Sequence, residues 1–240
     1  MNPALKSLNP IPETEERFQP VREVIDQAIA MFERQLLSLV DSGGFTKEIY
    51  VRYLSMQYHL TKGVQVPFSL VAAHPSMVGK RKLRDFLYHF ALEEEPHYEL
   101  ARKDIEALGE HVLDCPLDTA LWWAFYREKV QSRPFLRLGA TCVLENLGPG
   151  VKDMGRQLFA DATFITPQCM TFFEIHFHEA LPHGDQIIRA LTSVRLSDEE
   201  IEDCRIGAIL GATMYLRMVS WILRSDPIQS CFDEVLLQSA

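Results

Sequence analysis

The sequence has few cysteines, and none of them lies close to another. Five cysteines are spread between Cys115 and Cys231, and no two of them form a C-x-x-C motif. A disulfide-rich scaffold or a zinc ribbon needs closely spaced cysteines, so this spacing argues against both classes. Free cysteines are typical of a reducing compartment, and we expect a cytoplasmic protein.

The chain also lacks a surplus of positive charge. Its 24 Lys and Arg residues stand against 33 Asp and Glu residues, which gives a formal net charge of −9. Binding to nucleic-acid phosphates or to an anionic membrane surface depends on clustered Lys and Arg. The composition therefore argues against both kinds of partner.

Long hydrophobic runs are absent as well. The most apolar stretch, residues 206–216, ends at Arg217 and is shorter than the roughly 20 apolar residues that a transmembrane helix requires. Residues 1–18 contain three prolines, turn acidic early and show no apolar period. We expect no signal peptide there, and we expect an irregular arm over 1–18 followed by a single domain over 19–240.

What the sequence does contain is helical periodicity. Between Val21 and Val40 the apolar residues recur every three or four positions, which is the period of an amphipathic helix. Alternating patterns typical of strands are scarce. The chain is therefore predicted to form an all-α bundle of about seven helices. The expected helices cover 21–40, 46–73 with a kink at Pro67, 78–108, 118–131, 134–145, 168–181 with Pro182 as a kink, and 198–224.

The first candidate for metal chemistry is a carboxylate followed three residues later by a histidine. Glu94 and His97 have this spacing, which on one helix places both side chains on the same face, where they can share an ion. Glu93 is an alternative to Glu94. An isolated motif of this kind is more often part of an exposed acidic face, so the prediction depends on further ligands.

Two other segments supply such ligands. Glu145 lies in an apolar run, where an acidic side chain is costly to bury unless it is paired or bound to metal, although it could also occupy an exposed position. His176 and His183 are seven residues apart, two helical turns on one face, with Glu179 between them. By the same geometry His178 lies on another face of that helix. It is better interpreted as a partly buried histidine that is hydrogen-bonded to a neighbour.

These ligands are carboxylates and imidazoles from three predicted helices. Such a set favours iron or manganese over zinc, which more often recruits thiolates or three histidines. In this pattern, and in the segment 45–59, the chain resembles the haem-oxygenase-like di-iron oxidases and oxygenases, relatives of the TenA and PqqC proteins. That resemblance covers most of the chain and implies a haem-oxygenase-like helical bundle.

The resemblance also implies a ligand set. The family carries a Glu and a His on one helix, a Glu on a second, and H-x3-D-x2-H on a third. These positions correspond to Glu94 and His97, to Glu145, and to His176 and His183. The chain departs from the family at Ala180, which replaces the aspartate. Either the neighbouring Glu179 supplies the missing ligand, or the second iron has an open position, or metal binding is weak or mononuclear.

The activity implied by the resemblance is oxidation by O₂ at two Fe(II) ions, with a small amino-acid-like molecule as substrate. One kind of family member makes a nitrile from a brominated tryptophan, and this chain is similar to it in length and in the altered third motif. We therefore expect a biosynthetic oxidoreductase whose product could be such a nitrile. An external electron donor and a homodimer are further expectations.

Aromatic residues suggest where the substrate binds. Tyr58, Phe125 and Phe172 are candidates to enclose an apolar side chain, together with Trp122, Trp123, Tyr126 and Phe173. Arg156, with Lys152 nearby, is the candidate to pair with a substrate carboxylate. Core packing and surface solvation are the respective alternatives.

Two other functions are compatible with the sequence. A TenA-like hydrolase would use a cysteine nucleophile, for which Cys142 is a candidate because it lies one turn before Glu145. A metal-free helical protein that binds another helical partner is the second. Neither alternative accounts for the histidine and carboxylate spacing.

Overall fold

The computed structural model describes residues 8–177 and 182–224, and within them helices are the only regular secondary structure. The all-α prediction is confirmed, with more and shorter helices than expected. None of the described helices is both long and apolar enough to cross a membrane. The helices are α1 (Pro12–Arg17), α2 (Gln19–Asp41), α3 (Lys47–Thr61), α4 (Gln65–Ala73), α5 (Arg81–Glu94), α6 (His97–Ala107), α7 (Leu117–Ser132), α8 (Pro134–Gly150), α9 (Lys152–Ala160), α10 (Thr171–Phe177), α11 (His183–Thr192) and α12 (Asp198–Ile222), with the 3₁₀ turns η2 (Pro75–Met77) and η3 (Pro167–Cys169).

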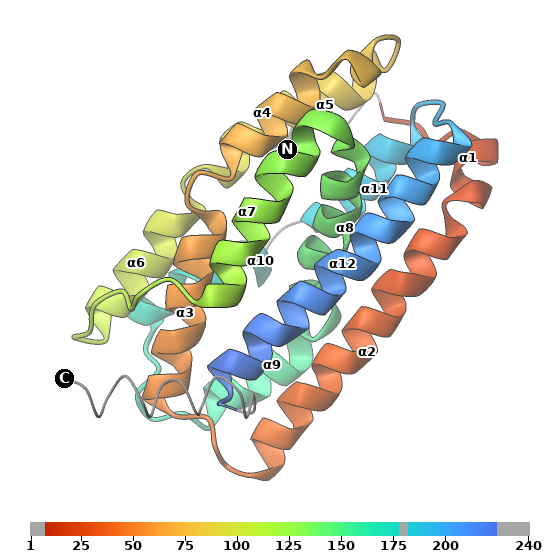
Figure 1. The fold of residues 1–240 in the computed structure, drawn as a ribbon. Coiled ribbons are helices and arrows are strands. Elements are labelled where there is room, and N and C mark those ends of the chain that lie inside the picture. The colour runs from red at the N-terminus through yellow and green to blue at the C-terminus, as the bar shows by residue number, and fades with distance from the viewer. Residues whose placement is uncertain (1–7, 178–181, 225–240) are drawn as a thin grey trace.

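Helix α8 is the centre of the bundle, and most of its residues are buried. It packs most extensively against α12 and also contacts α2, α7 and α11; α2 and α12 run side by side (Figure 1). The α8–α12 crossing is very close because glycines line it. A Cβ atom on Gly139 would lie 1.9 Å from the Cys204 carbonyl oxygen, and one on Gly207 would lie 2.0 Å from that of Leu136.

Two of the expected long helices are broken. The helix expected over 46–73 ends at Thr61 because Gly63 adopts a φ of +83°, a conformation that favours glycine. Pro67 then lies in the first turn of α4, where its missing N–H is not needed. The helix expected over 78–108 breaks at Pro96, which separates α5 from α6.

The segment 168–181 also differs from the expectation. Thr166 precedes the short 3₁₀ turn η3 instead of an α-helix, and α10 begins only at Thr171. Asp104 of α6 accepts hydrogen bonds from the backbone N–H groups of Thr171 (3.0 Å) and Phe172 (2.8 Å), which satisfies the start of α10. Pro182 precedes α11 and does not kink a continuous helix.

The described part of the N-terminal arm, residues 8–18, contains the helix α1, whereas an irregular segment was expected. Pro12 opens α1, a position where its ring favours helix formation. The arm is hydrogen-bonded to the end of α11 and to the loop before α12. The Ile11 N–H donates to the Thr192 carbonyl (2.8 Å), and Arg17 Nη1 donates to the Leu196 carbonyl (3.0 Å).

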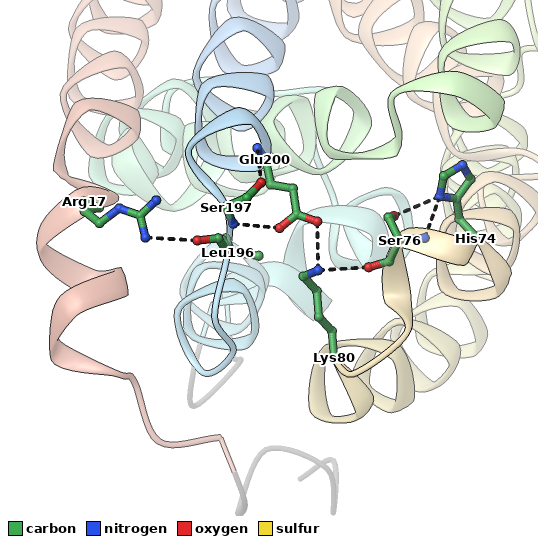
Figure 2. A network of polar contacts seen from close by, with 7 residues as sticks. All are labelled: Arg17, His74, Ser76, Lys80, Leu196, Ser197 and Glu200. Carbon is green, nitrogen blue, oxygen red and sulfur yellow. Dashed lines mark hydrogen bonds and ion pairs between the residues drawn. The ribbon is translucent and has the colours of Figure 1, made fainter.

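The start of α12 carries the expected capping box and more. Ser197 Oγ accepts from the Glu200 N–H (3.2 Å), and Glu200 Oε2 accepts from the Ser197 N–H (2.9 Å). Glu200 Oε1 also pairs with Lys80 Nζ (2.8 Å), which donates to the Ser76 carbonyl (3.0 Å) (Figure 2). This Ser197 network, formed by Ser197, Glu200, Lys80 and Ser76, joins α12 to the η2–α5 segment.

Candidate metal centre

Four of the predicted ligands meet inside the bundle. Glu94 is the last residue of α5, His97 is the first of α6, and His183 is the first of α11, while Glu145 comes from α8. Each histidine directly follows a proline at a helix start. The ligands therefore come together across helix breaks, and the assumption that Glu94 and His97 share one helix was wrong.

The carboxylate–histidine cluster, formed by Glu94, His97, Glu145 and His183, is tightly connected. His97 Nδ1 lies 2.8 Å from Glu94 Oε2, His183 Nδ1 is in close contact with Glu94 Oε1, and His183 Nδ1 is 3.8 Å from Glu145 Oε2. The two imidazole rings are nearly parallel, with centroids 5.9 Å apart. Glu94, His97 and His183 are buried, and the Glu145 side chain is 20% exposed.

A glycine allows His183 to reach the cluster. A Cβ atom on Gly184 would lie 2.2 Å from the side-chain amide of Asn146 on α8. Only a residue without a side chain lets the start of α11 approach α8 this closely. Asn146 is itself fixed, because its Nδ2 donates to the Cys142 carbonyl (2.6 Å). This contact places His183 beside Glu145.

The two carboxylates of the cluster differ in proton affinity. Burial alone would raise the pKa of Glu94, but the contacts with His183 and His97 outweigh it and lower that pKa well below its ordinary value. Burial, and then the nearby Glu94 carboxylate, raise the pKa of Glu145 to about 8. The charge of Glu94 is thus balanced by the two histidines, whereas Glu145 has only the longer contact with His183 (3.8 Å).

The donor set fits a divalent cation. One ligand atom from each of Glu94, Glu145 and His183 can be chosen so that all three lie within 4.8 Å of one another. Two carboxylates and an imidazole are hard or borderline ligands, which suit iron or manganese. His97 adds a second imidazole in contact with Glu94. The described residues therefore could hold one metal ion.

The remaining predicted ligands are less well defined. Glu93, the alternative to Glu94, is exposed on α5 while Glu94 is buried. His176 belongs to α10, on a different helix from His183, and its side chain lies outside the described part of the structure. Glu179 and Ala180 also lie outside the described residues. The ligands of a second metal ion therefore remain a prediction.

A cavity of about 180 Å³ borders the cluster. It extends along one face of α3, at Tyr50, Tyr53, Gln57 and Leu60, which recur with helical spacing. Gln57 Nε2 donates to the hydroxyls of Tyr53 (2.7 Å) and Tyr215 (3.1 Å), so the wall carries polar groups at fixed positions. The cavity is also lined by Glu94, Arg137, Glu145, Phe159, Phe172 and Phe173.

The structure brings only Phe172 of the four predicted substrate-binding residues to this cavity. Tyr58 instead contacts Tyr98 and accepts a hydrogen bond from Lys62 (2.8 Å). Phe125 packs at the periphery of the core below Lys129. Arg156 is exposed and pairs with Asp153 (3.5 Å). The spacing of apolar residues along a helix does not show whether a side chain packs in the core or lines a cavity, so these three residues could not be excluded from the sequence.

Sequence reasoning missed Arg137, which lines the cavity and is 3% exposed. The signal was present, because Arg137 interrupts the apolar run from Phe135 to Ala140 in the same way that Glu145 interrupts the next one. A charged residue inside an apolar helix is costly to bury without a partner. The same argument that selected Glu145 therefore selects Arg137.

No protein-family model matches the chain, and no curated protein sequence matches it. Among solved structures, the chain is similar to a domain of unknown function with a haem oxygenase-like fold from Shewanella denitrificans. The alignment has a TM-score of 0.71 and 22% sequence identity, and it covers 86% of this chain and 90% of the other. The haem oxygenase-like fold expected from the sequence is confirmed.

Proposed function

We propose that the protein is a non-haem di-iron oxidoreductase that uses O₂ to oxidise a small amino-acid-like molecule. The observation that supports this function best is the buried group Glu94, Glu145 and His183, with donor atoms within 4.8 Å beside a cavity. When bound, iron supplies the redox chemistry and the coordination positions for O₂. The haem oxygenase-like fold is compatible with this chemistry.

The chain's own residues have separate roles in this proposal. Glu94, His97, Glu145 and His183 hold the first metal ion, and His176 and Glu179 complete the second position. Metal ligands must be deprotonated, so the protons now shared between Glu94 and the histidines leave when metal binds. Apolar and aromatic side chains of the cavity exclude water from the reacting part of the substrate.

The finer proposal concerns the substrate. Phe159, Phe172 and Phe173 line the cavity, and aromatic side chains of this kind suit an aromatic amino acid such as tryptophan or a halogenated derivative. The product proposed for such a substrate is a nitrile: the α-carboxylate leaves as CO₂, the α-carbon and its amine lose four electrons and four protons, and one O₂ accepts them to form two molecules of water. An external donor can reduce the metal between turnovers.

The cysteine-hydrolase alternative is less well supported. Cys142 is fully buried on α8, and burial raises the pKa of its thiol far above the ordinary value. A nucleophilic cysteine needs the opposite shift. No cysteine of the described residues lines the cavity. A metal-free binding protein leaves the burial of two adjacent carboxylates without a purpose.

Anaerobic titration with Fe(II) followed by metal counting tests the proposal. We expect two iron ions per chain, as in di-iron carboxylate proteins, and consumption of O₂ that increases with tryptophan-type amino acids. His183→Ala should lower the iron content, whereas His111→Ala, a change at an exposed loop histidine, should not. Binding of less than about one iron per chain would contradict the proposal.

The second metal position has its own test. His176→Ala should reduce the iron content from two ions to one, because the ligands of the first ion are intact. Product analysis by mass spectrometry then separates the class of reaction from its outcome. Oxygen consumption without a nitrile keeps the oxidoreductase and rejects the finer proposal.

A further inference from the structure

Arg137 carries a positive charge into the wall of the cavity. Its side chain is buried, and its Nη1 donates to Thr141 Oγ1 (2.6 Å). Its Nε has no hydrogen-bond partner, and no carboxylate in residues 8–177 and 182–224 forms an ion pair with it. Burial lowers the pKa of Arg137, but an arginine side chain stays protonated in proteins.

Aromatic rings enclose the guanidinium. Its central carbon lies 4.9 Å from the ring centroid of Phe68, 5.4 Å from Trp122, 5.6 Å from Tyr126 and 6.0 Å from Trp123. Such contacts stabilise a cation and fix its orientation, but ring faces do not provide a countercharge. The group is therefore held in position with donor capacity that the described residues leave unused.

The other buried arginine of the described residues shows what a purely structural role looks like. Arg52 is 7% exposed, stacks on Trp221 at 4.1 Å, donates from Nε to the Ile222 carbonyl (3.2 Å), and contacts the Trp221 carbonyl. These carbonyls belong to the last turn of α12, where acceptors are left over. Arg52 thus donates to backbone carbonyls that the end of a helix leaves without a partner. Among the described residues, no backbone carbonyl accepts a hydrogen bond from the Arg137 side chain, which donates to Thr141 Oγ1.

The position of Arg137 in the cavity defines a direction. On α8 the lining residues run from Arg137 through Glu145 to Gly148, and on α9 they continue from Lys152 to Phe159. The guanidinium of Arg137 reaches Thr141 Oγ1 (2.6 Å), which lies one helical turn before Glu145, about 6 Å along the helix axis. A small molecule can therefore reach the guanidinium with one end while the adjoining atoms lie beside the metal-binding carboxylates.

We propose that Arg137 binds the carboxylate of the substrate, and that the substrate is a small aromatic or apolar acid oriented with its acid group toward α7 and α4. A guanidinium can pair with both oxygens of a carboxylate. In the metal-free protein Glu94 and Glu145 repel the same group. The other cation of the cavity wall, Lys152 at the start of α9, is half-buried, whereas Arg137 is buried, so the guanidinium is the more strongly desolvated partner for an acid. This inference rests on the proposed function in taking the cavity as the active site.

Calorimetric titration of the full-length, chelator-treated protein with two probes tests the inference. The probes are 3-phenylpropionate and 3-phenylpropanamide, which have the same shape and differ in carrying a charged acid or a neutral amide, so that neither is attracted to Glu94 and Glu145. We expect the acid to bind at least tenfold more tightly. Arg137→Met should abolish this preference. Arg156→Met, which removes an exposed arginine outside the cavity, should retain it.

A second measurement separates binding from folding. Trp122 and Trp123 are next to the guanidinium, so the acid should change the tryptophan fluorescence of the wild type. If Arg137→Met does not fold, Arg137→Lys keeps the charge without the fork, and the acid should bind it more weakly than the wild type. Equal binding of acid and amide to the wild type overturns the inference, as does a preference that survives in folded Arg137→Met.

These outcomes are independent of the iron titration because the protein is free of metal. If iron does not bind but the acid preference depends on Arg137, the proposed oxidation fails and the acid-binding role stands. If iron binds and the preference is unaffected by Arg137→Met, the oxidation stands and the role of Arg137 is rejected.

Discussion

The Ser197 network and the carboxylate–histidine cluster both consist of charged and polar side chains, but they balance charge in different ways. In the Ser197 network one carboxylate, Glu200, pairs with one ammonium group, Lys80. In the cluster two carboxylates, Glu94 and Glu145, converge on His183, and within the described residues neither has a Lys or Arg partner. Exposure does not separate the regions, because the side chains of Lys80, Glu200 and Glu145 are 15%, 16% and 20% exposed.

This difference separates stabilising groups from functional ones. The Ser197 network supplies donors and acceptors that the first turn of α12 needs, so each contact favours folding. Placing two carboxylates next to each other inside the bundle costs free energy unless a cation joins them. Under the proposed function the cluster lowers the stability of the metal-free protein and recovers it when a cation binds, so changes in the two regions should have different consequences.

The largest expected effect is the stabilisation of the cluster by metal. Free metal at about 100 times its Kd should raise the free energy of unfolding by about 2.7 kcal/mol. Glu94→Gln should remove this gain, and Glu93→Gln, a neighbouring exposed position, should retain it. Denaturant unfolding with and without Mn(II) measures the gain. An equal gain in both variants would show that metal binds elsewhere.

The next effect has the opposite sign to an ordinary mutation. The pKa of Glu145 is raised to about 8, so between about pH 4.5 and pH 8 this carboxyl group ionises in the unfolded chain but keeps its proton in the folded protein. The free energy of unfolding therefore falls as the pH rises through this range. Glu145→Gln should therefore stabilise the metal-free protein by a few kcal/mol at pH 9, at about 1.4 kcal/mol for each pKa unit, and by less than about 1 kcal/mol at pH 5. Urea unfolding at both pH values measures it, and a destabilised variant at pH 9 contradicts the charge imbalance.

Much of the fold could be predicted because helical periodicity and capping are local. The capping box at Ser197 and the helix start at Pro134 are where the sequence places them. The breaks at Gly63 and Pro96 were missed because an apolar period can continue across a change of helix direction. The close crossing at Gly139 depends on the partner helix α12, which no local pattern specifies.

The candidate site was predictable only in part. Sequence spacing and apolar context selected Glu94, His97, Glu145 and His183. The helix expected to carry both Glu94 and His97 is interrupted by Pro96, and the helix expected to continue to His183 is interrupted by Pro182. The candidate substrate-binding residues were harder to predict from the sequence. Aromatic residues such as Phe125 and Phe172 have the same helical spacing whether they face the core or a cavity. Which of them borders the cavity depends on how α3, α8 and α10 pack together.

A smaller effect is expected at the helix cap of the Ser197 network. Ser197→Ala removes the acceptor for the Glu200 N–H and should lower the free energy of unfolding by about 1 kcal/mol. The gain on adding Mn(II) should be the same as in the wild type, because Ser197 takes no part in the cluster. A cap variant that also loses the metal-dependent gain would break the separation of the two regions.

The smallest effect is expected for the ion pair of the Ser197 network. Lys80→Met keeps most of the length of the side chain and removes the contact of Nζ with Glu200 and the Ser76 carbonyl. Partly exposed ion pairs contribute about 0.5 kcal/mol, and Glu200 keeps its bond from the Ser197 N–H. The difference from the wild type should shrink in 1 M NaCl, where the Debye length falls to about 3 Å. A loss that is larger and independent of salt would mean that Lys80 acts through the contact of its ammonium group with the ring of Phe135 (5.8 Å from Nζ to the ring centroid). In that case the ion pair with Glu200 is not what stabilises the network, and the difference in charge balance between the two regions loses its energetic basis.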